Sequence, residues 1–171
     1  MKKSISLTVA VLLAVMLFVL CGCDVELPEV SEAKPTRTAL VLVDVDVNSL
    51  LTKADMEEAL GVTLREPQIS NEGRTLFAIA EEGGISLSVS IEKQSIEKFR
   101  QALPQVADED LQAAPNLADE AWWLSSGRTL FLYSRGYTAS VTISDREADE
   151  ESVLLACRQL ATKLCNRLPV E

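Results

Sequence analysis

The chain has the pattern of an α+β protein in which helices pack on one face of an antiparallel sheet. Short β-branched segments joined by glycine-containing turns are typical of antiparallel strands, and other segments repeat apolar residues at helical spacing. The pentapeptide GRTLF occurs at residues 73–77 and 127–131, each time followed by a strand and a helix. The chain therefore contains either two related strand-strand-helix halves or two unrelated hairpins that use the same turn-and-strand sequence.

The first elements are expected to be a strand and a helix. Residues 39–47, ALVLVDVDV, end in alternating Val and Asp, which predicts a strand with one wet face. Thr52 followed by Asp55 three residues later forms a capping-box pattern, so we expect a helix that begins after Thr52 and ends at Gly61.

The middle of the chain predicts a hairpin, a short helix and an acidic connection. Residues 75–80 and 85–91 are the two strands of the hairpin. Ser95 is placed to cap the helix, and Pro104 limits it. The connection that follows is expected to hold a short helical turn near residues 108–113.

The C-terminal third predicts three strands and a long helix. The strands are expected at residues 121–124, 129–134 and 138–143, and the helix at 148–168. One helix face carries an apolar stripe, made of Val153, Cys157, Leu160, Leu164 and Leu168. Cys157 and Cys165 are about 12 Å apart along this helix and cannot bond to each other. We expect buried apolar thiols, with an intermolecular disulfide or a reactive thiol as the alternative.

Charge and composition exclude several functions. The chain has 171 residues, with 16 Lys and Arg against 26 Asp and Glu, for a net charge of -10, which argues against nucleic acid as a partner. It has no histidine, so a Ser-His-Asp or Cys-His site and histidine metal ligands are excluded. We expect no cofactor.

The N-terminus has the layout of a secretion signal. Lys2 and Lys3 precede an uncharged run at residues 5–20, which is shorter than the roughly 20 residues that span a bilayer. We expect residues 1–22 to be cleaved; an uncleaved membrane helix is the alternative.

The end of this run, Leu20-Cys21-Gly22-Cys23, resembles the lipobox of bacterial lipoproteins. The resemblance implies that Cys23 receives a diacylglycerol with acyl chains such as palmitate, which anchors the protein to a membrane outside the cytoplasm. Residues 23–38 contain two prolines among charges and are expected to be a flexible tether, with a single domain at 39–171. The mature chain keeps 14 basic and 26 acidic side chains, a net charge of -12.

Two further segments, residues 48–61 and 117–123, resemble an uncharacterised family of bacterial extracytoplasmic lipoproteins best known from actinobacteria, a domain of unknown function. The resemblance implies a small α+β domain on a lipid anchor and assigns no catalytic residues. Asn48 stands where members often have a cysteine, so their disulfide has no counterpart here.

Several acidic groups are candidates for a chemical site. Asp44, Asp46 and Asn48 have the spacing of a calcium loop, but Ser49 replaces the required glycine, so we expect no metal site. Paired carboxylates such as those at 108–110 and 149–151 leave a small hydrolase as an alternative function.

Trp122 and Trp123 are the most informative side chains. Neighbours in a strand point to opposite faces, so if one ring is in the core, the other tends to lie on the outer face or under a helix. Two interpretations stay open: both rings are buried by packing, or one of them contacts a ligand or partner. The working hypothesis is a non-catalytic binding or accessory module of the cell envelope, with this pair, Asp119 and Glu120 near the contact surface. A small acidic hydrolase and a purely structural envelope protein are the alternatives.

Overall fold

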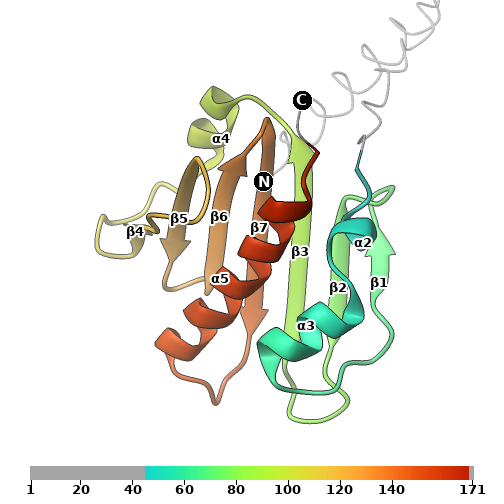
Figure 1. Cartoon of the computed structure of the whole chain (residues 1–171). Coiled ribbons are helices and arrows are strands. Elements are labelled where there is room, and N and C mark those ends of the chain that lie inside the picture. The colour runs from blue at the N-terminus through green and yellow to red at the C-terminus, as the bar shows by residue number, and fades with distance from the viewer. Residues whose placement is uncertain (1–44, 170–171) are drawn as a thin grey trace, which may run out of the picture. The chain divides into compact units, whose positions relative to one another are not determined.

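The computed structural model of the protein describes residues 45–169, which form one seven-stranded sheet and its helices (Figure 1). The elements in chain order are α2 Val47–Leu50, α3 Lys53–Leu60, β1 Gln68–Ser70, β2 Thr75–Ile79, β3 Ser86–Lys93, α4 Ile96–Ala102, β4 Leu111–Ala113, β5 Glu120–Leu124, β6 Thr129–Ser134, β7 Tyr137–Ser144 and α5 Glu150–Arg167. The expected leader (1–22), Cys23 with the tether (23–38), and residues 39–44 of the first expected strand lie outside the described residues. None of the described helices is both long and apolar enough to cross a membrane.

The sheet is antiparallel throughout, which confirms the predicted α+β class. Its strand order is β1-β2-β3-β7-β6-β5-β4. The two longest strands, β3 and β7, have 8 residues each and pair along their whole length in the middle of the sheet. Hairpins need only short turns, so each half of the sheet is built from neighbours in the sequence.

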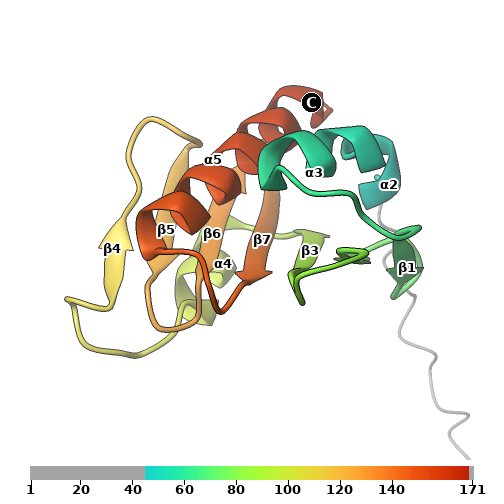
Figure 2. The same ribbon diagram turned by 90° about the horizontal axis from the view of Figure 1, so that it is seen from below.

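Helices α2, α3 and α5 cover one face of the sheet, which we call the inner face (Figure 2). The predicted stripe of α5 is buried against apolar side chains of the strands, and this layer forms the core. A fully buried Leu contributes roughly 2 kcal/mol relative to an exposed one, so a stripe of this length holds α5 firmly. The strand residues of the core include Leu76, Leu87, Val89, Leu130, Leu132, Val141 and Ile143.

Helix α3 has the predicted boundaries. The hydroxyl of Thr52 accepts a hydrogen bond from the Asp55 backbone N–H at 3.2 Å, and the Asp55 carboxylate accepts one from the Thr52 N–H at 2.9 Å. Gly61 ends the helix in the left-handed conformation with φ of 68°, which favours glycine. The capping box and the C-cap are therefore confirmed.

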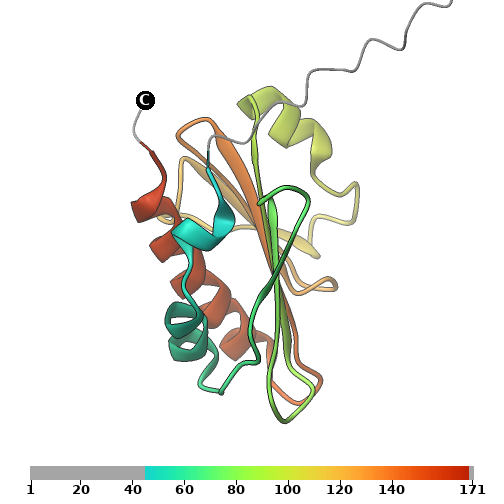
Figure 3. The same cartoon turned by 90° about the vertical axis from the view of Figure 1, so that its right-hand side faces the viewer.

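Helix α4 lies on the opposite, outer face, near one end of β5 and β6 (Figure 3). Ser95 caps it as predicted, by accepting from the Lys98 N–H. Its Phe99 is buried, with the ring centroid 5.9 Å from that of Tyr133. This helix covers a corner of the outer face and leaves the middle of the sheet uncovered.

The described end of the first expected strand is helical, so that prediction is wrong at Val47. Asp46 accepts a hydrogen bond from the Asn48 N–H at 2.9 Å and thereby caps α2. Ser49 also bonds to the Asp46 carbonyl oxygen. Short polar side chains that bond to nearby backbone start a helix here, although alternation with Val favoured a strand.

Two other segments differ from expectation. The helical turn expected near 108–113 is present only at its start, where the Ala107 carbonyl accepts from the N–H groups of Asp110 and Leu111 at 2.9 and 3.3 Å. Residues 111–113 instead form β4, because Asp110 is tied to the β5–β6 turn through the Ser126 N–H at 2.7 Å and hydroxyl at 2.6 Å. This attachment places the segment alongside β5. Strand β1 was not predicted; its three residues are exposed and pair only with β2 among the described strands.

The two hairpins that contain GRTLF are related by an approximate two-fold rotation. Val89 of β3 and Val141 of β7 are direct cross-strand partners and occupy equivalent positions in the two hairpins. The equivalent carbonyls of Arg74 and Arg128 accept from Ile91 and Ile143 at 2.8 and 3.2 Å. This symmetry favours related halves for the strands, but α4 and α5 lie on opposite faces, so it does not extend to the helices.

Candidate binding surface

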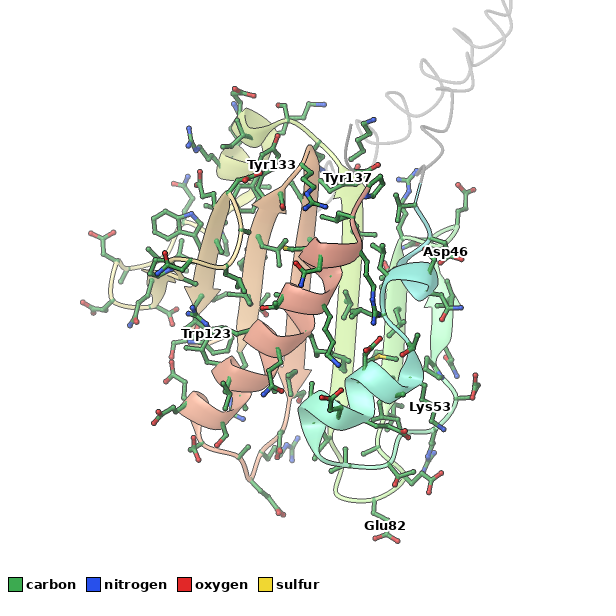
Figure 4. All side chains as sticks on the ribbon, viewed as in Figure 1. Asp46, Lys53, Glu82, Trp123, Tyr133 and Tyr137 are labelled. Atoms are coloured by element: carbon green, nitrogen blue, oxygen red, sulfur yellow. The ribbon has the colours of Figure 1, made fainter. Side chains whose placement is uncertain are left out.

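Trp123 is part of the core and does not reach the surface. It is 2% exposed and lies between β5 and the first turn of α5 (Figure 4). Its indole N–H donates to Glu150 Oε1 at 2.9 Å, and the Ser125 hydroxyl donates to the same oxygen at 2.6 Å. Both hydrogen bonds lower the pKa of Glu150, and the one from Ser125 has the larger effect. This tryptophan therefore attaches β5 to α5.

Trp122 points to the outer face and is half-buried there. Its cross-strand partner is Phe131 of β6, so two rings lie next to each other on this face. The Trp122 indole N–H donates to Glu120 Oε1 at 2.9 Å. Of the two predicted tryptophans, this is the one near solvent.

Glu120 connects the outer face to α4. Its Oε2 accepts from the Arg100 Nε and lies 2.8 Å from both Nε and Nη2 of that side chain. The hydrogen bond from Arg100 lowers the pKa of Glu120, against the effect of burial, and the Trp122 bond adds to the lowering. The carboxylate stays ionised at neutral pH and positions Trp122 and Arg100 together.

Asp119 is exposed but holds a turn. Its Oδ2 accepts from the backbone N–H of Arg135 at 3.0 Å. Arg135 begins the β6–β7 turn with φ of 52°, a conformation that needs such support in a residue other than glycine. The structure therefore brings Asp119, Glu120 and Trp122 to one corner of the sheet, while Trp123 faces the other side of it.

The outer face of the four middle strands is almost free of charge. One quarter of the chain is charged, and yet these strands present hydroxyls, rings and aliphatic groups to this side. Glu92, at the end of β3, is the one charged side chain among them in this part of the sheet. The outer-face residues are Thr75, Phe77 and Ile79 on β2, Ser86, Ser88, Ser90 and Glu92 on β3, Thr138, Ser140, Thr142 and Ser144 on β7, and Thr129, Phe131 and Tyr133 on β6.

Several hydroxyls on this face bond to one another. Ser90 and Ser140 are joined by their Oγ atoms at 2.8 Å across β3 and β7. Thr129 and Thr142 are joined in the same way at 2.9 Å across β6 and β7. Removing water from a hydroxyl costs less free energy when that hydroxyl already has a hydrogen-bond partner in the protein. The desolvation cost of covering this face is therefore small.

Large apolar side chains on this face are exposed. Phe77 is 38% and Ile79 37% exposed on β2. An antiparallel sheet with one wet face ordinarily places charged or strongly polar residues there. A surface that has aromatic residues and lacks charged ones is instead typical of the core of a protein interface.

Several acidic groups elsewhere in the described chain hold structural contacts. Asp55 is bound by Arg167 and Lys163 of α5, and Asp149 caps α5 by accepting from the Ser152 N–H at 2.8 Å. Asp46 caps α2 as described, and Asp44 lies outside the described residues. Within 45–169 no group of three or more His, Cys, Asp or Glu is placed to hold a metal ion.

Both described cysteines are free and buried, as predicted. Burial raises the pKa of Cys157 to about 12 and also raises that of Cys165, where the Ser134 hydrogen bond acts in the opposite direction. The thiolate is the nucleophilic form of cysteine, so neither thiol is activated at neutral pH.

The comparisons with known proteins found no matching family model, curated protein or solved structure. The resemblance of residues 48–61 and 117–123 to the lipoprotein family stays a prediction. In the structure the first segment contains the end of α2 and all of α3, and the second leads into β5.

The uncharged outer face was not predicted, although its signal was present in the sequence. Hydroxyl residues alternate with apolar ones in SLSVSI and YTASVTIS, so each of these strands has one hydroxyl face. What the sequence pattern could not provide was the pairing of β3 with β7, which joins the two hydroxyl faces into one strip.

Proposed function

We propose that the protein is a non-catalytic binding module, held by lipid on Cys23 at a membrane and facing outside the cytoplasm, and that it binds through the outer face of its sheet. The observation that carries this proposal is the near absence of charge from that face in a chain whose net charge is -10. Interface cores are depleted in charged residues and enriched in aromatic ones.

A binding role is further supported by the state of the reactive groups. The pKa values of Asp55, Asp110, Glu120, Asp149 and Glu150 are all lowered by hydrogen bonds or ion pairs. A general acid at neutral pH needs the opposite shift. These carboxylates are structural links and helix caps, which favours binding over hydrolysis.

In this proposal the predicted site residues have different roles. Trp122 borders the contact surface, and Glu120 with Arg100 fixes α4 beside it. Asp119 supports the neighbouring β6–β7 turn. Trp123 supports the sheet from the inner side and makes no contact with the partner.

The anchor is tested by metabolic labelling of the producing cells with a palmitate analogue. We expect label on the full-length protein and on a Cys21→Ser variant, and none on Cys23→Ser. Label that persists in Cys23→Ser would contradict the assignment of the anchor.

The contact surface is tested by photocrosslinking of the full-length protein in its own cells. A small diazirine-bearing amino acid at Ser88, in the middle of the outer face, is compared with the same group at Gln159, an exposed position on α5. We expect a discrete crosslinked product from position 88 and none from 159. Equal products from both, or none from either, would overturn the proposal.

A further inference from the structure

We propose that the outer face binds a second copy of this chain, with the two sheets packed face to face around a two-fold axis that runs along β3. This inference rests on the proposed binding function and names the partner. Its basis is the position of large and small side chains on the face, the place of α4, and the area of the face that α4 leaves open.

The large side chains of the outer face lie at two opposite corners. Phe77 and Ile79 of β2 are level with the first half of β3 in the pairing register. Phe131 and Tyr133 of β6 are level with its second half, across β7. The other two corners carry threonines, and the serines and threonines of β3 and β7 lie between. The large residues therefore follow a diagonal of the face.

A diagonal pattern of this kind is complementary to itself. A two-fold axis parallel to the strands exchanges the two sides of the opposed face and keeps its ends. With the axis on β3, its neighbours β2 and β7 exchange, so Phe77 lies opposite Thr142 of the second copy at the same level. Phe131 likewise lies opposite Ser70 of β1. Large side chains thus face small ones on both flanks, as close packing requires.

The place of α4 determines where the axis runs. This helix stands on the outer face at one end of β5 and β6, with Phe99 on Tyr133 (Figure 3). Facing sheets are about 10 Å apart and a helix is about as wide, so a second sheet cannot lie over α4. The strands that α4 leaves mostly open are β1, β2, β3, β7 and β6, and β3 is the middle one.

The short strand β1 leaves room for α4 in this arrangement. In the pair, β1 of the second copy lies over β6, and it ends at Ser70, before the level of Tyr133. Helix α4 then stands next to the end of that strand. An exposed edge strand is ordinarily covered or shortened, and this contact covers part of β1.

The open face has the area of a small dimer interface. Five strands about 4.8 Å apart give a width of about 24 Å. These strands have between 3 and 8 residues, which gives a mean length of about 20 Å. The pair therefore covers about 1,000 Å² in total, the lower limit for a specific interface. Such a dimer is weak in solution, and anchoring both copies in one membrane raises their effective concentration.

Charge opposes the contact only near the ends of β3. Glu81 and Glu82 lie in the turn before this strand and Glu92 near its end, and all three are exposed. Near the axis each of them faces its counterpart in the second copy, at the rim, where salt screens the repulsion. We therefore expect Glu92→Gln and added salt to strengthen the association.

The test uses two differently tagged full-length copies in the protein's own cells, each with the diazirine group at Ser88. This residue lies on the axis, so irradiation should give a product that contains both tags and has twice the chain mass. The same group at Gln159 on α5 is the control and should give none. A product with both tags from Gln159 and none from Ser88 would overturn the proposal.

The arrangement is tested with the diazirine group at Phe77. Mass spectrometry should place its crosslink on β7 of the second copy, near Thr142. A crosslink to the helices of the second copy, or to its β2, would overturn the face-to-face arrangement around β3.

Other products separate this inference from the proposed function. A crosslink from Ser88 to a different protein, a lipid or a glycan would overturn the dimer and leave a binding face. A crosslink to another segment of the same chain, or no product from any outer-face position, would overturn both.

Paired charges provide a matched test at the axis. Ser88→Arg in both copies brings two like charges together, and Ser88→Glu in both does the same. We expect the two-tag product from a diazirine at Ser90 to fall about tenfold or more in each case, because an unpaired charge is costly at an interface. It should recover when one copy carries Ser88→Arg and the other Ser88→Glu, and it should stay unchanged with Gln159→Arg in both.

Recovery in the mixed pair shows that neither charge damages the fold. An unreduced product with like charges would overturn the proposal, and so would a lack of recovery between variants that circular dichroism shows to be folded. The crosslinks from Ser88 and Phe77 need no charged variant, so they decide the question if one of these variants does not fold.

Discussion

The guanidinium of Arg167 in the last turn of α5 donates to both carboxylate oxygens of Asp55 in the first turn of α3, with Nη2 3.1 Å from Oδ1. Asp55 is 7% exposed and also accepts from Lys163 and from Thr52, the N-cap of its own helix. The same Arg167 donates to the Leu50 carbonyl at the end of α2. Asp55 therefore caps α3 and joins it to α5, and Arg167 joins α5 to the end of α2.

Removal of this carboxylate should destabilise the protein. Asp55→Ala leaves Arg167 without its carboxylate partner and breaks the capping box, so we expect the free energy of unfolding to fall by about 2–3 kcal/mol. Urea titration followed by circular dichroism measures this change. Glu58→Ala is the control, because Glu58 is exposed and bonds only to Lys163 among the contacts described for its carboxylate. It should have almost no effect; equal losses in both variants would contradict the assigned role of Asp55.

The same site should control stability in acid. The hydrogen bond from Arg167 lowers the pKa of Asp55 well below its ordinary value of 3.8; burial opposes this, and Thr52 and Lys163 add to the lowering. A carboxyl group with a lowered pKa in the folded state contributes stability above its unfolded pKa, and this contribution is lost as the pH falls. We expect stability to decrease from about pH 5 downward, with a shallower decrease in Asp55→Asn. Glu82→Gln, in an exposed turn, should keep the steeper pH dependence of the natural chain.

The elements with strong local signals were predictable from the sequence. Helix α3 carries both members of its capping box, and the apolar stripe of α5 extends over its whole length, so local and tertiary preferences agree. Strand β4 depends instead on Asp110 reaching Ser126, a contact between residues 16 apart in the chain. Helix α2 depends on Asp46, whose alternation with Val indicated a strand. Local patterns could not decide these two cases.

The candidate site was predictable only in part. Opposite orientations for Trp122 and Trp123 follow from strand geometry, and the structure confirms them. Which of the two is buried depends on where α5 lies, and that is a long-range property. The outer face depends on β3 pairing with β7 across 50 residues of chain, as in the bond between Ser90 and Ser140.

The two tryptophans should differ in solution. In Trp122→Phe the remaining Trp123 is buried, so its fluorescence should resist quenching by acrylamide; in Trp123→Phe the remaining Trp122 should be quenched more readily. Trp123→Ala should cost about 3–5 kcal/mol of unfolding free energy, as expected for a large side chain removed from a core. Trp122→Ala should cost clearly less. The reverse order in either measurement would contradict the placement of the two rings.

The buried thiols should be unreactive in the folded protein. Cys157 is fully buried with its pKa raised to about 12, and Cys165 is 9% exposed. In a chain with Cys21→Ser and Cys23→Ser, we expect a thiol reagent such as DTNB to modify both cysteines only after unfolding in guanidinium, since reaction needs an accessible thiolate. Leu155→Cys in the same background is the positive control, because Leu155 is 58% exposed on the same helix. Fast modification without that substitution, or a covalent dimer on a non-reducing gel, would instead favour the intermolecular disulfide or reactive thiol that the sequence alone leaves open.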